Sequence, residues 1–136
     1  MNIEKRELKL STGKTACYEY DRDGDVLEII FQSGEATGAV ELTESIVLRF
    51  NWETNEPLSL SFISFSRLLQ ANPYGEVHFQ LLTDEWPDEI RDKIWPMLLK
   101  TPLADFLKLS GYAPAHTHQI IPMATIRQPY LMPQAA

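Results

Sequence analysis

The chain has 136 residues and a mass of 15.6 kDa, which is enough for one hydrophobic core and not for two. Twelve basic and nineteen acidic residues give a net charge of −7, and this balance disfavours binding to nucleic-acid phosphates. A single cysteine, Cys17, excludes an intramolecular disulfide and fits a reducing compartment. The first residues contain no apolar run of signal-peptide length, so we expect a cytoplasmic protein that does not bind membranes.

The acidic excess is concentrated in one stretch. Residues 19–56 contain ten acidic side chains and only two basic ones. Such a stretch attracts basic partners, and it is also an ordinary way for a small domain to stay soluble, so both interpretations remain open.

Short segments with apolar residues at alternate positions fill the first half of the chain. The Asp23-Gly24 dipeptide predicts a tight hairpin turn between strands at 16–20 and 26–32. The same alternation predicts further strands at 39–42, 46–52 and 58–63. We expect an antiparallel meander of four to five strands with one buried face.

The second half of the chain changes to helical spacing. Thr83 or Asp84 is expected to cap a helix with an apolar stripe at 90–98, which Pro96 should break or kink. Thr101-Pro102 predicts a second helix that ends at Gly111, so that two short helices cover one sheet face. Residues 76–82 are a candidate for one more strand.

Prolines at 114, 122, 129 and 133 predict an extended C-terminal arm without regular structure. Because the arm is too apolar for a solvated tail, we expect it to dock on folded protein or on a second copy, and we predict a homodimer. The predicted interaction residues are Ile120, Ile121, Met123, Tyr130, Leu131 and Met132. The expected fold is therefore a single α+β domain over 1–136, with a sheet at 16–70, a helical extension at 71–111 and the arm at 112–136.

The sheet region contains Tyr20-Asp21, Asp25, the strand with Leu27, Ile29 and Phe31, and Glu41-Leu42-Thr43 before Ile46-Val47-Leu48. In these residues it resembles the YuzE-like family, small bacterial proteins that form a domain of unknown function. The resemblance covers about residues 18–63 and implies a small antiparallel sheet without an established active site. It also implies a binding role, because some members are thought to be partners of small toxin-like proteins.

Two groups of residues have metal-binding character. The acidic run from Asp21 to Asp25 does not fit a calcium loop, because Val26 and Gln32 occupy the positions that need glycine and glutamate. His116 and His118 lie two residues apart and would face the same side of an extended segment, but a metal site needs more ligands than these two. We expect an acidic hairpin turn and no bound metal or other cofactor.

No pattern for nucleophilic catalysis or phosphate binding is present. Cys17 is expected to be a buried thiol, and the serines between Ser59 and Ser66 are expected to be solvent-facing hydroxyls outside any Gly-x-Ser-x-Gly motif. The aromatic residues either line a ligand pocket or, as their spacing favours, form the core: Trp52, Phe62, Phe65, Phe79, Trp86, Trp95 and Phe106.

These observations favour a non-catalytic interaction module, an antitoxin-like acidic partner of a small basic protein. The first alternative is a small metal-dependent enzyme that uses His116 and His118. The second alternative is a structural homo-oligomer.

Overall fold

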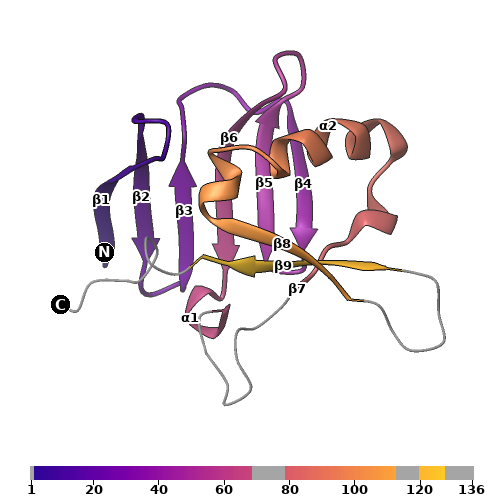
Figure 1. Ribbon diagram of the computed structural model, residues 1–136. Helices are drawn as coiled ribbons and strands as arrows, with labels where there is room; N and C mark the ends of the chain where they lie inside the picture. Colours follow the sequence, from indigo (N-terminus) through magenta and orange to yellow (C-terminus); the bar gives the residue numbers. More distant parts are fainter. Residues whose placement is uncertain (1, 69–78, 113–119, 128–136) are drawn as a thin grey trace.

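The computed structural model describes residues 2–68, 79–112 and 120–127. It shows two antiparallel sheets and few helices, which confirms the α+β class in outline (Figure 1). Within these ranges, none of the helices has the length and apolar character needed to cross a lipid bilayer.

The large sheet has six strands, more than the expected four to five. They are β1 (Ile3–Lys9), β2 (Thr15–Asp21), β3 (Val26–Ile30), β4 (Gly38–Thr43), β5 (Ile46–Asn51) and β6 (Glu56–Ile63). Their order is β1-β2-β3-β6-β5-β4, so two three-stranded meanders are joined where β3 pairs with β6. The prediction of one continuous meander is wrong, because alternating apolar residues specify which face of a strand is buried but not which strand lies beside it.

The β2–β3 hairpin is confirmed, with its turn at the Asp23-Gly24 dipeptide. Asp25, not Gly24, has the left-handed backbone, with φ of 55°. The side chain of Asp21 stabilises the turn by accepting hydrogen bonds from the amides of Asp23 (3.0 Å) and Gly24 (3.2 Å).

The second half of the chain forms a smaller sheet where helix and irregular arm were expected. Strand β9 (Ile121–Ile126) lies between β7 (Phe79–Gln80) and β8 (Leu107–Tyr112). The predicted helix from Thr101 to Gly111 is therefore wrong: only the short 3-10 helix η2 (Leu103–Asp105) forms before β8 begins. The arm is also not irregular throughout, because Pro122 lies within β9, where its carbonyl accepts a hydrogen bond from the Leu81 amide.

Helix α2 (Asp88–Leu98) carries the predicted apolar stripe, and Ile94, Met97 and Leu98 are buried. Its N-cap is Pro87; the predicted cap residues Thr83 and Asp84 lie in the preceding 3-10 helix η1 (Thr83–Glu85). The helix continues through Pro96 and ends two residues later, so the expected break does not occur. A proline this close to a helix end removes one hydrogen bond from the last turn only.

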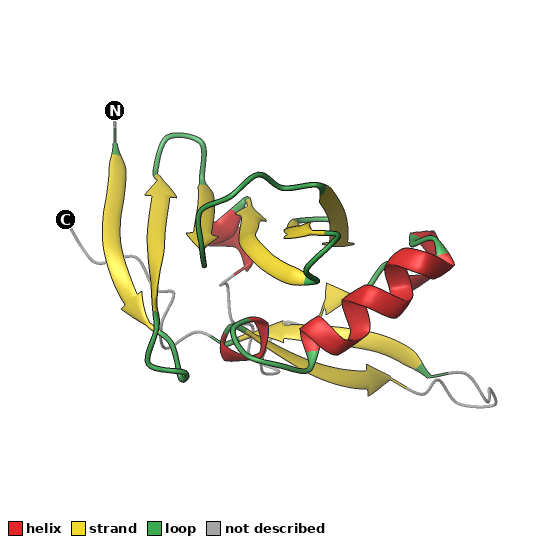
Figure 2. Ribbon diagram, turned by 90° about the horizontal axis from the view of Figure 1, so that it is seen from above, coloured by secondary structure: helices red, strands yellow, loops and turns green. Residues whose placement is uncertain are grey.

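The core lies between one face of the large sheet and a layer made of α2 and the small sheet, both on the same side (Figure 2). The edge strand β4 is tied to this layer, because its Glu41 and Leu42 carbonyls accept hydrogen bonds from the Trp86 indole (2.8 Å) and the Leu82 amide (2.9 Å). The short helix α1 (Phe65–Leu68) follows β6 and adds Phe65 to the core. Most of the aromatic residues belong to this core or pack against it, as their spacing favoured: Trp52, Phe62, Phe65, Phe79, Trp86, Trp95 and Phe106.

Candidate functional site

Several predicted site residues lie outside the described residues. These are the histidines His116 and His118, and the arm residues Tyr130, Leu131 and Met132. Within the described ranges, no group of three or more histidine, cysteine or acidic side chains is arranged to hold a metal ion. Of the other predicted interaction residues, Ile120 is 71% exposed, and Ile121 and Met123 are half-buried in β9.

The structure corrects two expectations about nucleophiles. Cys17 is exposed, not buried, because it points away from the core on β2. Ser59 and Ser61 are buried, with exposed fractions of 5% and 7%, because larger neighbours on the adjacent strands cover these small side chains. Arg49 donates a hydrogen bond to the Ser61 hydroxyl (2.7 Å).

A polar cluster joins the β2–β3 turn to α1. The Asp25 carboxylate accepts hydrogen bonds from the Tyr20 hydroxyl (2.7 Å), the Ser66 amide (2.9 Å) and the Ser66 hydroxyl (2.6 Å). The Asp25 carbonyl also accepts a hydrogen bond from the Phe65 amide (2.9 Å). Residues 41 positions apart are thus held together, and we call this cluster the turn latch.

The electrostatics of the turn latch suit a structural role. Burial acts to raise the pKa of Asp25, but the hydrogen bonds from Ser66 and Tyr20 together outweigh it and hold the pKa below its ordinary value. Burial, with the hydrogen bond to Asp25 and its charge, raises the pKa of Tyr20 to about 12. A carboxylate that stays ionised beside a hydroxyl that stays protonated gives a stable hydrogen bond and a poor acid–base pair at neutral pH.

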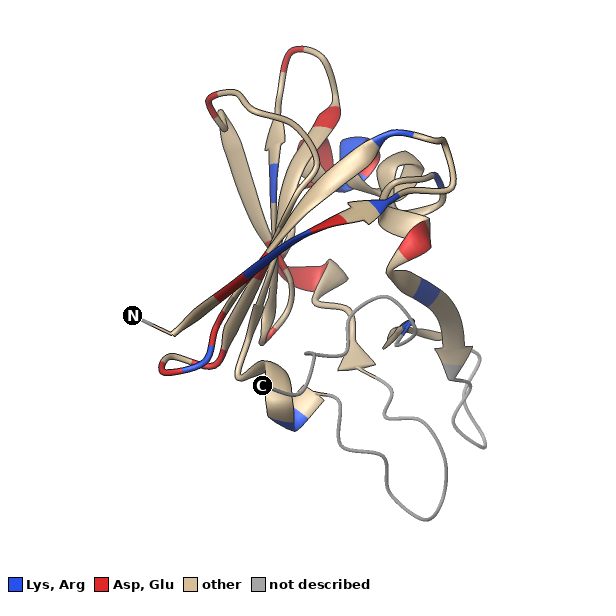
Figure 3. Cartoon of the chain, turned by 90° about the vertical axis from the view of Figure 1, so that its left-hand side faces the viewer, with Lys and Arg blue, Asp and Glu red and all other residues tan. Residues whose placement is uncertain are grey.

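The opposite face of the large sheet is not covered by α2 or by the small sheet (Figures 2 and 3). We call it the open face. In the strand register, one row across it reads Lys5, Glu19, Glu28, Ser61, Val47 and Glu41. The next row reads Glu7, Cys17, Ile30, Ser59, Arg49 and Ala39. The open face therefore has small buried serines at its centre and apolar, acidic and basic side chains around them, the basic ones being Lys5 and Arg49.

Two glutamates on the open face are cross-strand neighbours. Glu19 of β2 is the cross-strand partner of Glu28 of β3, and both side chains are half-buried. Glu19 has an ion pair with Lys5 at 3.7 Å, but the Lys5 side chain is 69% exposed, so this pair contributes little. Within the described part of the chain, Glu28 has neither a hydrogen bond nor an ion pair through its side chain.

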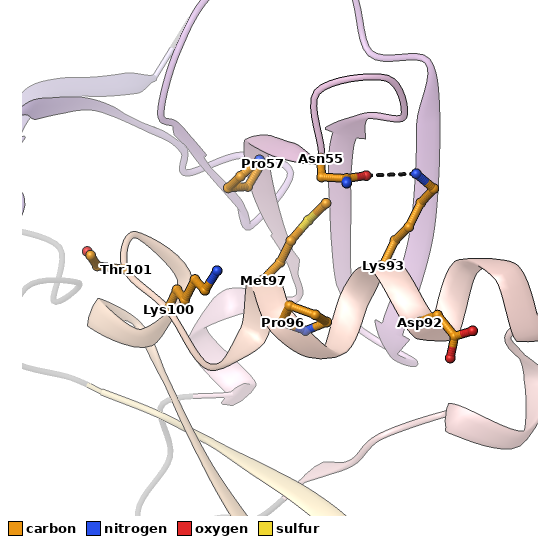
Figure 4. Close-up of a pocket in the computed structure, with 8 residues that line it drawn as sticks. All are labelled: Asn55, Pro57, Asp92, Lys93, Pro96, Met97, Lys100 and Thr101. Atoms are coloured by element: carbon orange, nitrogen blue, oxygen red, sulfur yellow. Dashed lines mark hydrogen bonds between the residues drawn. The ribbon is translucent and has the colours of Figure 1, made fainter.

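A cleft of about 300 Å³ lies elsewhere, between α2 and the β5–β6 turn (Figure 4). We call it the α2 cleft. It is lined by Asn55, Pro57, Asp92, Lys93, Pro96, Met97, Lys100 and Thr101. A neighbouring hollow of about 280 Å³ shares Pro57 and Thr101 with it.

Neither the open face nor the α2 cleft was identified from the sequence. The acidic stretch was recognised, but finding that Glu19 and Glu28 are opposite each other required the register of β2 and β3. Asn55 and Lys93 are 38 residues apart, and no sequence signal brings them together.

In comparisons with known proteins, no family model, no curated protein and no solved structure matches this chain. The YuzE-like resemblance stays a prediction.

Proposed function

We propose that this protein is a non-catalytic interaction module that binds a basic protein partner through its open face. The observation that carries the proposal is the cross-strand pair of Glu19 and Glu28. Like charges directly opposite each other on a sheet destabilise the fold, so this pair does not serve stability. A cationic side chain placed between the two carboxylates would remove this repulsion.

The surroundings of this pair fit a protein partner. Val26, Val47 and Ile63 offer apolar contacts beside it, and Ile63 is 44% exposed. Protein–protein interfaces typically combine apolar contacts with charged groups. A partner with alternating basic and apolar side chains would match both features, so the antitoxin-like role predicted from the sequence would require a small basic protein with such a surface.

Binding of a defined probe tests the proposal. A short peptide of alternating lysine and leucine should shift the amide NMR signals of β2, β3 and β6 in the full-length chain. The same peptide with glutamate in place of lysine should not. Glu19→Gln with Glu28→Gln should weaken binding at least fivefold, because two charge contacts are lost.

A matched double variant separates the open face from net charge. Glu35→Gln with Glu53→Gln removes the same charge from two exposed loop positions outside the strands of the sheet. This control should bind the basic peptide almost as well as the unmodified chain. Equal weakening by both double variants would show a general charge effect and contradict the proposal.

A further inference from the structure

One cation of the α2 cleft is held in a fixed position. Lys93 projects from α2, and its ammonium group donates hydrogen bonds to the Trp52 carbonyl (3.1 Å) and to Asn55 Oδ1 (2.8 Å). The same ammonium lies 4.8 Å from the centre of the Trp52 ring. The two hydrogen bonds use two of its three protons, so the ammonium can donate one more hydrogen bond.

Asn55 provides a second donor next to Lys93. Its Oδ1 accepts from Lys93, and its side-chain nitrogen has no hydrogen-bond acceptor among the described residues, so it can donate in another direction. Asn55 has a left-handed backbone, with φ of 57°. Its backbone N–H donates a hydrogen bond to the Asn51 carbonyl (2.9 Å), and this contact fixes the position of the residue. Two neighbouring donors, one of them charged, suit the two oxygens of a carboxylate.

Lys100 is a second cation that lines the cleft, away from the Lys93–Asn55 pair (Figure 4). It is exposed, and in the described ranges it has no ion pair or side-chain hydrogen bond. The one acidic lining residue, Asp92, points its carboxylate away from the other labelled side chains (Figure 4). The cleft of this acidic protein is thus locally cationic.

The surface between the two lysines is apolar. Met97, which is only 6% exposed, lines the cleft between them, and Pro57 faces it from the β5–β6 side (Figure 4). The cleft therefore offers cations in two places and a short apolar surface between them.

From this arrangement we propose that the α2 cleft binds a linear organic dicarboxylate. One carboxylate would contact Lys93 and Asn55, the other would contact Lys100, and the carbon chain would lie on Met97 and Pro57. This site is separate from the open face and does not rest on the function proposed for it.

Calorimetric and amide NMR titrations of the full-length protein test this inference. The probes are the linear dicarboxylates from glutarate to suberate, with heptanoate and heptanamide for comparison. We expect the best dicarboxylate to bind at least fivefold more tightly than heptanoate, and heptanoate more tightly than heptanamide. Amide signals of Asn55, Lys93 and Lys100 should shift.

Three variants with the same change in charge identify the roles of the lysines. Lys100→Met should weaken dicarboxylate binding about fivefold, the weight of an exposed ion pair, and leave heptanoate binding unchanged. Lys93→Met should weaken both about tenfold, because a hydrogen-bonded charge is lost. Lys108→Met, at an exposed position on β8, is the control and should change neither.

Among the described residues, the Lys100 side chain has no hydrogen bond or ion pair, so its variant decides the question even if Lys93→Met is unstable. Unchanged dicarboxylate binding in Lys100→Met would overturn the inference. Equal binding of heptanamide and the acids would also overturn it, because the cleft would then be only apolar. Tighter binding of inorganic phosphate than of any dicarboxylate would overturn the inference as well. Absence of binding by all the dicarboxylates would do the same.

Discussion

The two faces of the large sheet differ in what they bury, although the same strands form both. On the covered face, Leu27, Ile29, Leu60 and Phe62 are fully buried against the second layer. On the open face, the alternate positions carry half-buried charges, small serines and exposed apolar groups. Because side chains alternate along a strand, the residues that fill the core and the residues of the open face alternate along one chain segment. A substitution at an exposed position of the open face should therefore cost less stability than one at its neighbour on the covered face.

The largest expected effect is a difference in the free energy of unfolding between substitutions at two adjacent residues of β6, one on each face of the sheet. Phe62→Ala should lower the free energy of unfolding by about 3–5 kcal/mol, because it leaves a cavity in the covered face. Ile63→Ala should lower it by less than about 1 kcal/mol, because Ile63 is 44% exposed on the open face. Urea denaturation measures both. Similar losses would mean that the open face is also packed against something.

The turn latch gives the next largest effect, because it ties a turn of the sheet to α1. Asp25→Asn should lower the free energy of unfolding by about 1–2 kcal/mol, because an amide cannot accept all the hydrogen bonds from Tyr20 and Ser66. Asp23→Asn removes the same charge from an exposed position in the same turn and should change stability by less than about 0.5 kcal/mol. Equal effects would assign the loss to charge and not to the latch.

The lowered pKa of Asp25 makes the contribution of the turn latch to the free energy of unfolding depend on pH. Since its pKa is lower in the folded chain than in the unfolded one, the ionised carboxylate stabilises the fold above the unfolded pKa of about 4. This stabilisation is lost as the pH falls through the folded pKa. The difference in stability between the unmodified chain and Asp25→Asn should be constant from about pH 5 to 7 and should shrink below about pH 4. A difference that grows in acid would contradict the assignment.

The parts of the fold that were predicted correctly have local causes. The strand positions around Leu27, Leu48 and Leu60 were predicted because alternate residues face one core. Strand β1 was not identified, because its inward positions include the polar residues Glu4 and Arg6. Arg6 is accommodated there by stacking 4.2 Å from the centre of the Tyr18 ring, a contact that hydrophobic periodicity does not detect.

The parts that were predicted wrongly depend on contacts between distant segments. Phe106 and Leu107 have helical spacing with Leu103, but the chain extends at Leu107 because β9 pairs with it. Contacts between distant segments also determine which residues form the candidate sites, so only part of these sites could be predicted. The acidic stretch indicated a surface for basic partners, while the Lys93–Asn55 contact depends on where α2 lies against the β5–β6 turn.

The smallest expected effect is a gain in stability on the open face. Glu28→Gln should raise the free energy of unfolding by a few tenths of a kcal/mol, because it removes repulsion from Glu19. In a chain that already carries Glu19→Gln, the same change should have no effect, so the double-mutant cycle isolates the interaction of the pair.

Glu19→Gln alone should raise the free energy of unfolding by less than Glu28→Gln, because it also removes the contact with Lys5. High salt should reduce the gain from Glu28→Gln, since the repulsion is between solvent-accessible charges. If Glu28→Gln lowers stability at low salt, the two carboxylates do not repel, and the open face loses the feature that distinguishes it from an ordinary solvated surface.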